Sequence, residues 1–510
     1  MLLLVATALA APAPVLATDG APLHDGVGAL LLAVEAHLSH EGPDACLTPL
    51  VAELRLRADE LTPAERAWAT QALMPWKRDF QDPVKPLRAT PPPPAPDPGS
   101  ASEPCFSLGA NRITSDHFAV EWDDGTISES TAEGFLDSLE EGYAVEVDEL
   151  GWKPPLQGNN YLVLAYVQPG SAQGAYTTIE SCGRGLVPYI VAYAGSFSNR
   201  SWGETMAVHE LNHALQFGYG FAWEFWWWEA TATYVGGVVY PNSDWWAYYV
   251  TGYSENPHLA FNASDQNDQD IFWHMYGMGL WGAYLHEYQG GHDTVLATWE
   301  AAEGESGMYT YGMDDAFDDL ELDFDAAYAD FVVRNTVMDY EDQDAIPNVD
   351  ERAEIDTLPD GDEVDGSSRP QGHGQTYIRF EKEAGEGDLV VEFSGDTDAD
   401  WLVQLVEVSR TDVLRVVAAD IVDGVGSVTM PGFGGNDVVL VASPLEGDDT
   451  RYGFTWSADV VEPAPVADDP LDEGDGDGEV AAGCGCDTGG TPALGIGALL
   501  GLAALARRRR

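Results

Sequence analysis

Basic residues are scarce in this chain. Its 510 residues include 23 lysines and arginines against 86 aspartates and glutamates, which gives a formal net charge of −63. A surface of this charge repels phosphates, which argues against nucleic acid as a partner. The acidity serves solvation, and it also favours weakly held hard cations such as Ca²⁺. The acid-rich stretches DGDEVDG and DEGDGDG lack the full EF-hand pattern, so we interpret them as solvated linkers and keep Ca²⁺ binding as the alternative.

Cysteine is also rare, with five in the whole chain. Three lie in the body (Cys46, Cys105 and Cys182), so they cannot all pair with one another, and we favour a Cys105–Cys182 disulfide. The chain starts with the apolar run MLLLVATALAAPAPVLA, which ends in small residues but lacks the usual basic start. We predict a signal peptide over residues 1–17 and therefore an exported protein, a context that permits disulfides.

The segment after the signal peptide is predicted to be a helical unit over residues 18–88. In LTPAERAWATQAL, Thr62 is placed to cap a helix, with Pro63 at its first position and Glu65 completing a capping box. A stiff Pro-rich linker follows over residues 89–104. The unit could be an inhibitory propeptide or an accessory domain, and the sequence leaves both interpretations open. Cys46 offers a thiolate that could cap a metal, although its surroundings do not favour this role.

Residues 105–345 have the pattern of an α+β domain. The segments SDHFAVEW and NNYLVLAYV predict strands on either side of an amphipathic helix over about residues 128–150. GLVPYIVAYA predicts a further strand, and residues 201–340 are mostly helical in pattern. We therefore expect a mixed sheet followed by helices.

The remainder of the chain is predicted to hold an acidic linker (346–368), an all-β sandwich (369–462) and a second, Gly-rich acidic linker (463–483). The sandwich is indicated by seven short alternating segments separated by Gly and Asp turns: QTYIRFE, DLVVEFSG, WLVQLVEVS, LRVVAADI, GSVTMPG, DVVLVASP and YGFTWSADV. A structural or spacer role is favoured for it over ligand binding.

The C-terminal stretch, residues 484–510, combines three features. Cys484 and Cys486 precede an apolar run over residues 492–506, and Arg507–Arg510 end the chain. The run is shorter than the ~20 residues of an ordinary bilayer span, and the arginines would stay in the cytoplasm. This pattern resembles the MYXO-CTERM-type sorting signal of myxobacterial surface proteins. The resemblance implies cleavage near the cysteine pair by a sorting protease and display at the cell surface or outer envelope, or release from it. Membrane contact is expected only through this short transmembrane segment.

The stretch MAVHELNHALQ carries the clearest sign of chemistry. Ser201 and Glu204 predict a capping box that starts a helix, on which His209 and His213 lie one turn apart on a common face. This spacing suits two imidazole ligands of one tetrahedral Zn²⁺. Glu210 would lie beside the open coordination position, where a carboxylate can act as the general base.

A third ligand must come from elsewhere. A metzincin would have glycine and histidine where this chain has Gln216 and Tyr219. Glu229 follows His213 by sixteen positions, and we favour it over Glu224 because a carboxylate within a helix of tryptophan and alanine needs a partner to be buried. The small residues that accompany it would let two helices approach closely: Ala230, Ala232 and Gly236.

The segments HELNHALQ and WEATATY together resemble the gluzincin zinc metallopeptidases, and more narrowly a metalloprotease family described from myxobacteria. The resemblance covers about residues 112–340. It implies a zincin-like domain that holds one Zn²⁺ through His209, His213 and Glu229, with Glu210 as catalytic acid and base. It implies nothing about the substrate.

We therefore predict an exported, surface-sorted zinc metalloendopeptidase that acts on a protein or peptide. Tyr234, His274 and Tyr276 are candidate oxyanion stabilisers, although each also fits a core role. The aromatic stretches FWWWE and DWWAYYVTGY are interpreted as core packing rather than as the lining of a cleft. One alternative is a surface adhesion or binding protein with an inactive protease-like domain, although such a scaffold would not need Glu210. Another is a zinc hydrolase of a non-peptide bond.

Overall fold

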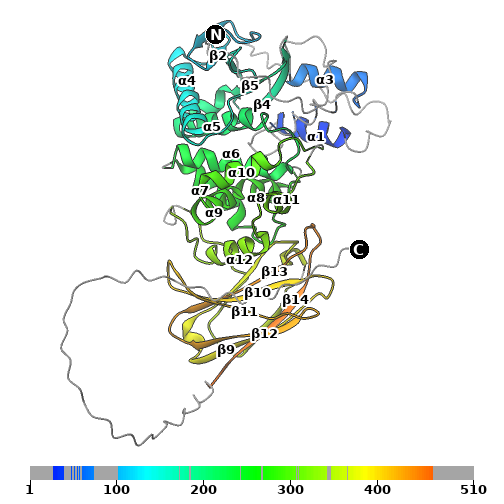
Figure 1. The fold of residues 1–510 in the computed structure, drawn as a ribbon, viewed down its shortest axis with the longest axis vertical. Helices are drawn as coiled ribbons and strands as arrows, with labels where there is room; N and C mark the ends of the chain where they lie inside the picture. Colours follow the sequence, from blue (N-terminus) through cyan, green and yellow to red (C-terminus); the bar gives the residue numbers. More distant parts are fainter. Residues whose placement is uncertain are drawn as a thin grey trace, which may run out of the picture. The chain divides into compact units, whose positions relative to one another are not determined.

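The structure is a computed structural model. It describes residues 27–38, 48, 51, 54, 57, 60–73 and 101–462, except 172, 183–184, 242, 266–267, 306, 308, 342–345 and 365 (Figure 1). The predicted signal peptide, Cys46, most of the Pro-rich linker, and the predicted linker and sorting signal from residue 463 on lie outside the described residues.

A five-stranded mixed sheet begins the α+β part, in the order β1-β2-β3-β5-β4. β2–β3 and β3–β5 are parallel pairs, while β1 and β4 pair antiparallel at the two edges. The strands are β1 (Asn111–Thr114), β2 (Phe118–Trp122), β3 (Val163–Gln168), β4 (Ala175–Cys182) and β5 (Gly185–Tyr193). The sequence predicted β2, β3 and β5 but not the two edge strands.

The predicted amphipathic helix is present as α4 (Glu129–Tyr143), which continues as the π-helical turn η2 (Ala144–Glu149). Ser128 caps it, since its side chain accepts from the backbone N–H of Thr131 at 3.1 Å. α4 packs with the following helix, α5 (Arg200–Gln216), in the same core as one face of the sheet. The sheet therefore supports the helix that carries the two histidines.

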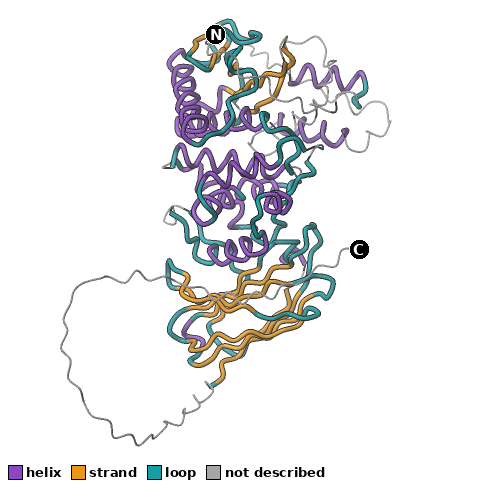
Figure 2. Tube along the Cα trace, viewed as in Figure 1, coloured by secondary structure: helices purple, strands orange, loops and turns teal. Residues whose placement is uncertain are grey.

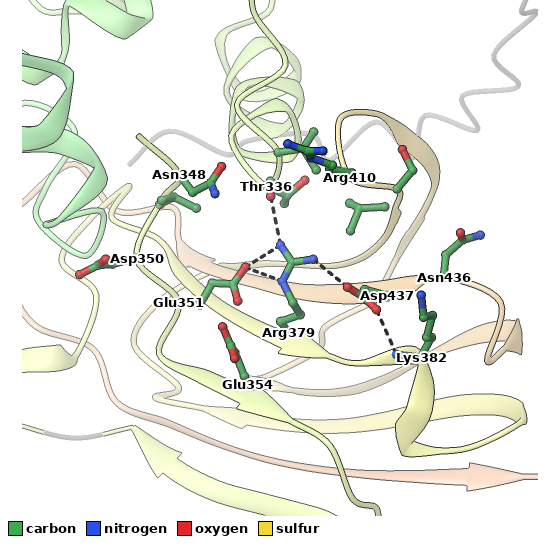
Figure 3. Close-up of a pocket in the computed structure, with 14 residues that line it drawn as sticks. Thr336, Asn348, Asp350, Glu351, Glu354, Arg379, Lys382, Arg410, Asn436 and Asp437 are labelled. Carbon is green, nitrogen blue, oxygen red and sulfur yellow. Dashed lines mark hydrogen bonds and ion pairs between the residues drawn. The ribbon is translucent and has the colours of Figure 1, made fainter. Parts of the chain in front are cut away.

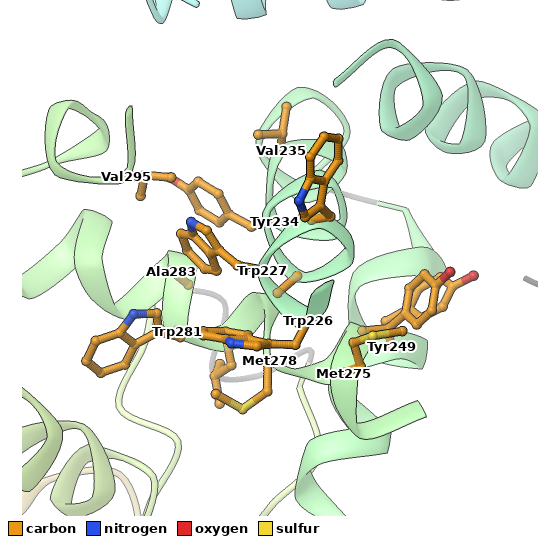
Figure 4. Packing of buried hydrophobic residues seen from close by; sticks show 14 of the residues in the cluster. Trp226, Trp227, Tyr234, Val235, Tyr249, Met275, Met278, Trp281, Ala283 and Val295 are labelled. Carbon is orange, nitrogen blue, oxygen red and sulfur yellow. The ribbon is translucent and has the colours of Figure 1, made fainter. Parts of the chain in front are cut away.

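In the part of the chain that the structure describes, seven more helices follow α5: α6 (Phe225–Val239), α7 (Asp244–Ser254), α8 (Gln269–Gly277), α9 (Gly279–Tyr288), α10 (His292–Ala301), α11 (Met313–Asp319) and α12 (Phe324–Arg334). Figure 2 shows them in purple. Large aromatic side chains fill their core, among them Trp226, Trp227 and Trp281, all fully buried (Figure 4). The prediction of core packing for FWWWE is thus confirmed.

The start of α5 differs from the prediction. The helix begins at Arg200 because Asn199 is its N-cap, with the side-chain oxygen 3.5 Å from the N–H of Trp202. Glu204 does not close a capping box; it forms an ion pair with Arg200 at 2.5 Å. The observed cap lies two positions before the predicted one, Ser201, and His209 and His213 still lie one turn apart on the same helix.

The C-terminal part is a two-sheet β-sandwich, with strand orders β11-β10-β13-β8-β6 and β12-β9-β14-β7. The seven predicted segments are all strands: β8 (Thr376–Phe380), β9 (Gly387–Gly395), β10 (Trp401–Val408), β11 (Val413–Ala418), β12 (Val425–Phe433), β13 (Asp437–Pro444) and β14 (Phe454–Val461).

The predicted acidic linker at 346–368 supplies two more strands, and that prediction was wrong in this respect. β6 (Ala353–Ile355) and β7 (Asp360–Val364) each lie at the edge of a sheet. Most of β7 is exposed, so its acidic side chains face solvent, and the segment resembles a linker in composition. DGDEVDG therefore lies largely in a strand paired with β14 rather than in a cation-binding loop.

The sandwich and the helices share one hydrophobic core. Tyr377, Val406 and Val439 of the sandwich belong to the same buried cluster as the tryptophans. Hydrogen bonds also cross this junction, from the hydroxyl of Tyr253 to Gln375 at 2.8 Å and from that of Tyr328 to the carbonyl of His373 at 2.6 Å. The sandwich is thus packed onto the helices and is not merely a spacer.

The N-terminal unit contains α1 (Val27–Leu38) and α3 (Pro63–Leu73). The predicted capping box at the start of α3 is confirmed by bonds of 2.6 Å and 3.3 Å between Thr62 and Glu65. Apolar side chains of this unit pack against β-sheet residues that alternate with those facing α4 and α5: Ala119, Leu164, Tyr166, Tyr189 and Val191. The unit therefore covers the opposite face of the five-stranded sheet.

A disulfide joins Cys105 to Cys182, the pair favoured from the sequence, with the Cα atoms 6.3 Å apart. It ties the start of the α+β part to the end of β4. Within the described ranges, no helix combines the length and apolarity that a membrane span needs.

Candidate metal centre

Two neighbouring helices bring three potential ligands together. On α5, the Nε2 atoms of His209 and His213 lie 3.2 Å apart. On α6, Glu229 places Oε2 3.2 Å from His209 Nε2 and 3.5 Å from His213 Nε2. All three side chains are at most 1% exposed. Glu229, which follows the two histidines by twenty and sixteen positions, thus meets them at a single buried point.

Glu224, the alternative third ligand, lies elsewhere. It occupies the N-cap position of α6, where its carboxylate accepts from Trp226 Nε1 at 3.0 Å and from Asn262 Nδ2 at 3.2 Å. Burial raises its pKa, and these hydrogen bonds lower it in part. The structure therefore assembles the group around Glu229.

The donor set fits a metal ion. A tetrahedral site with bonds of about 2.0–2.1 Å has ligand–ligand edges of about 3.3–3.4 Å, close to the three separations here. Among the described residues, Glu229 Oε1 and His209 Nδ1 are buried and have no hydrogen-bond partner. Burial would raise the pKa of Glu229, but His213 and His209 outweigh it and lower this pKa to about 2. His209, His213 and Glu229 could thus hold a metal ion through an ionised carboxylate.

The proton on His213 is fixed by a buried amide. His213 Nδ1 lies 2.7 Å from Gln216 Oε1, and Gln216 Nε2 donates to the carbonyl of Trp228 at 3.0 Å and to Asn212 Oδ1 at 2.8 Å. Because the Trp228 carbonyl can only accept, Gln216 must present its oxygen to His213. His213 therefore donates from Nδ1, which leaves Nε2 as the ring nitrogen that faces Glu229 and could bind a metal ion.

The chain of hydrogen bonds ends on a second buried carboxyl. Asn212 Nδ2 donates to Glu146 Oε2 of η2 at 2.9 Å, and Glu146 is completely buried. Burial raises the pKa of Glu146 well above its ordinary range, and the bond from Asn212 offsets this only in part. The sequence used Gln216 only to exclude the metzincin pattern, and no local spacing pointed to Glu146.

Glu210, the predicted base, is held by two threonine hydroxyls. Its Oε2 accepts from Thr177 Oγ1 at 2.7 Å and from Thr48 Oγ1 at 3.1 Å. The backbone N–H of Thr177 in turn donates to Thr48 Oγ1 at 2.5 Å. Thr177 lies on β4 and Thr48 in the N-terminal unit, so neither partner could be found from the motif itself.

Aromatic side chains form a wall beside His209 and Glu210. Together with Met206 of α5, four rings line a cavity of about 10 Å³: Trp202, Trp245, Tyr249 and Tyr276. The ring of Tyr276 stacks on His209 with centroids 5.9 Å apart. DWWAYYVTGY therefore contributes to the core and also lines the site.

Of the three candidate oxyanion stabilisers, the structure brings only Tyr276 next to a ligand. The hydroxyl of Tyr234 lies 2.7 Å from His286 Nδ1 and 3.2 Å from His292 Nδ1. His274 Nε2 lies 3.2 Å from the carbonyl of Ala260, and burial lowers its pKa to about 3. Cys484 and Cys486 lie outside the described residues.

A larger cavity, of about 750 Å³, lies at the sandwich (Figure 3). Its central side chain is Arg379, which forms ion pairs with Glu351 at 2.7 Å and Asp437 at 3.5 Å. None of the residues predicted to bind or react lines this cavity. Arg379, Glu351 and Asp437 pair with one another there, and the three candidate metal ligands lie elsewhere.

Comparison with known proteins adds a family but no function. Residues 101–412 match a family described as "Family of unknown function (DUF6055)". A search of curated proteins found no match. Among solved structures, the pre-peptidase C-terminal domain of collagenase from Bacillus anthracis is 11% identical, with 22% of this chain and all of that domain covered and a TM-score of 0.17. A family GH115 4-O-methyl-alpha-glucuronidase, with specificity for decorated arabinogalactans, is 9% identical, with 52% and 40% covered and a TM-score of 0.15. Similarities this weak carry no argument about fold or function.

Proposed function

The chain belongs to the DUF6055 family, whose function is unknown, and from its site we propose that it is a zinc-dependent metallopeptidase. The observation that carries the proposal is the convergence of His209, His213 and Glu229, with Glu210 adjacent to the first of them. Two imidazoles and one carboxylate are the ligands of a catalytic zinc that keeps its fourth position open.

The surrounding residues have defined roles in this proposal. A zinc ion at the site would polarise the scissile carbonyl and lower the pKa of an attacking water. Glu210 would serve as the general base toward the attacking water and as the general acid toward the leaving amine. Thr177 holds the Glu210 carboxylate in place, Gln216 keeps Nε2 of His213 available as a ligand, and Tyr276 is the candidate donor to the oxyanion.

The finer fold and location are part of the same proposal. The mixed sheet, the helix pair α5–α6 and the antiparallel edge strand β4 support a zincin-like arrangement. The start and end of the sequence support export followed by sorting to the cell surface or release from it. Proteins and peptides are the proposed substrates.

Two other functions would use the same fold. A surface binding protein with an inactive protease-like domain would have no need for Glu210, a buried carboxylate next to the three candidate ligands. A zinc hydrolase of a non-peptide bond would retain the whole group, and only its substrate distinguishes it from a peptidase.

Three glutamate-to-glutamine variants test the proposal. We expect the wild type to bind about one zinc per chain, Glu229→Gln to lose it, and Glu210→Gln to retain zinc but lose about 10²–10⁴-fold in peptide hydrolysis. Glu224→Gln is the matched control, because it lies on the same helix outside the ligand group, and it should keep both properties. Elemental analysis after dialysis and digestion of a peptide library with and without chelator provide the measurements.

Unchanged zinc content in the Glu229→Gln protein would remove Glu229 from the ligand set. Full activity in the Glu210→Gln protein would contradict the mechanism. Normal zinc binding with no peptide cleaved by the wild type after its N-terminal unit has been removed would favour one of the two alternative functions.

A further inference from the structure

The N-terminal unit reaches the candidate base. Thr48 is fully buried, donates its hydroxyl proton to Glu210 Oε2 at 3.1 Å, and accepts the N–H of Thr177 at 2.5 Å. One side chain from outside the α+β part thus forms hydrogen bonds both with the carboxylate of Glu210 and with a backbone N–H of β4. The mechanism proposed above gives Thr48 no role.

The site is closed in this arrangement. Glu210 and His209 are 1% exposed, and the cavity beside them, about 10 Å³, has room for about one water molecule. β4 is the edge strand next to the site, and an edge strand is where an extended peptide can add by main-chain hydrogen bonds. Thr48 already takes the N–H of Thr177 on that strand, so a peptide cannot use the same donor.

Apolar packing also holds the N-terminal unit, which carries Thr48, against the five-stranded sheet. Val27, Leu31 and Leu54 of the N-terminal unit are buried in one cluster with Tyr166 and Tyr189 of the sheet. The family match begins at residue 101, so this unit stands outside the shared domain. A segment that is separate from the family domain, yet packed against it and bonded to its base, is suited to control access.

We propose that β4 and Glu210 form a docking surface for the chain's own N-terminal unit, which keeps the metal centre closed until the unit leaves. This inference rests on the proposed function for its consequence, the suppression of peptide hydrolysis. Of the two interpretations left open by the sequence, it selects the inhibitory propeptide. The contact is made by Thr48, and Cys46 is not needed for it.

A pair of substitutions in the full chain tests the contact. Thr48→Val removes the hydroxyl but keeps the shape, whereas Thr48→Ser keeps the hydroxyl and is the matched control. Since the closed form of Thr48→Val leaves the Thr177 N–H without its partner, we expect a rise of at least about tenfold in peptide hydrolysis and in the rate of zinc loss to a chelator. Hydrogen exchange at residues 175–182 should accelerate as well. Thr48→Ser should resemble the wild type in all three measurements.

A second measurement addresses the whole unit. A site for an unrelated protease, inserted within residues 89–99, allows the full chain to be nicked after it has folded. The N-terminal unit is then held only by non-covalent packing, so its release follows mass action. Specific activity, zinc loss and exchange at 175–182 should all increase on dilution of the nicked protein, and remain constant on dilution of the intact one.

The outcomes separate this inference from the proposed function. Equal zinc loss and equal exchange in Thr48→Val, Thr48→Ser and the wild type, with no effect of dilution after nicking, would overturn the docking. Faster exchange and zinc loss with no peptide hydrolysed would support the docking and overturn the peptidase. Exchange at 175–182 requires neither metal nor catalysis, so the docking remains testable even in a protein that binds no zinc.

Discussion

Buried carboxylates in this acidic protein are accommodated in four different ways. Glu229 faces two imidazoles, and Glu210 accepts from two threonine hydroxyls. Glu121 bonds to Arg112 and to two backbone N–H groups. Glu146 has one amide donor, from Asn212, and its Oε1 has no partner within the described part of the chain. Glu146 is therefore the carboxyl that folding favours in its protonated form.

The protonation of Glu146 makes stability depend on pH. Its folded pKa is raised by burial, so the native state binds more protons than the unfolded state above pH ~4.5, and stability falls as pH rises from there toward the folded pKa. Glu146→Gln removes this titration and can keep the bond from Asn212. We expect the variant to gain on the wild type by up to about 1.4 kcal/mol per pH unit in that range, measured by urea unfolding at a series of pH values. A parallel pair of pH profiles would contradict the raised pKa.

Among the residues of the site, the sequence predicted those that lie on α5 or on the next helix along the chain, α6. His209, Glu210 and His213 follow from spacing on α5, and Glu229 from the need to partner a buried carboxylate. Thr48 and Thr177 come from segments 162 and 33 residues away from Glu210, so only the folded chain brings them to it. The choice of Tyr276 over Tyr234 likewise depends on which faces of α6 and α8 meet other helices.

The helix that carries Glu229 is set by close contact with α9. A Cβ atom on Gly282 would lie 2.7 Å from Cγ of Tyr234, and one on Gly279 would lie 3.1 Å from the carbonyl of Ala230. Both neighbours are on α6, so the two glycines allow α9 to approach the backbone of α6. The position of Glu229, the third candidate ligand, thus depends on two glycines of the neighbouring helix that leave room for the backbone of α6.

Two alanine substitutions distinguish this packing from helix propensity. Gly282→Ala introduces a clash with a buried ring and should destabilise the protein by about 1–3 kcal/mol. Gly134→Ala, in α4, meets nothing within 4 Å and should stabilise it by about 0.5–1 kcal/mol through helix propensity. Denaturant unfolding of both variants provides the comparison, and a neutral Gly282→Ala would show that α9 is free to shift.

Elements with strong local signals were predictable, and edge strands were not. The cap at Thr62 marked α3, the amphipathic pattern over about residues 128–150 marked α4, and alternating apolar residues marked the central strands. β4 has the sequence AYTTIESC. Its buried positions include Thr177 and Thr178, so the segment lacks the alternation of apolar and polar residues that predicts a strand. β7 is acidic and mostly exposed, which concealed it in a segment with the composition of a linker.

Over the whole molecule, the helices and the sandwich behave as one folded body in their packing. Tyr253 and Tyr328 bond across the junction, and Tyr377 is buried in the helical core. The family match ends at residue 412, between β10 and β11, and so includes only part of the sandwich. The sequence predicted the domain over residues 105–345 and the sandwich over 369–462 as separate units, and it contained no indication that they share a core.

Two truncations test this shared core. A chain that ends at residue 350 loses the sandwich and exposes the apolar surface around Tyr253, so we expect it to lose cooperative unfolding. A chain that ends at residue 462 keeps every described strand and should melt within about 2 °C of the full chain, a shift below about 1 kcal/mol. Calorimetry makes the comparison, and a cooperatively melting chain of 350 residues that binds zinc would contradict the shared core.

The Cys105–Cys182 disulfide has a consequence for the protein once its N-terminal unit is gone. A cut in the Pro-rich segment would create a new chain start shortly before Cys105. The disulfide joins Cys105 to Cys182, the last residue of β4. The Glu103 carbonyl also accepts from the N–H of Leu162 at 3.1 Å, so the backbone at residues 103–105 would stay attached to the sheet after such a cut. Reduction of the disulfide would therefore remove the covalent link between this chain start and β4, the strand whose Thr177 holds Glu210.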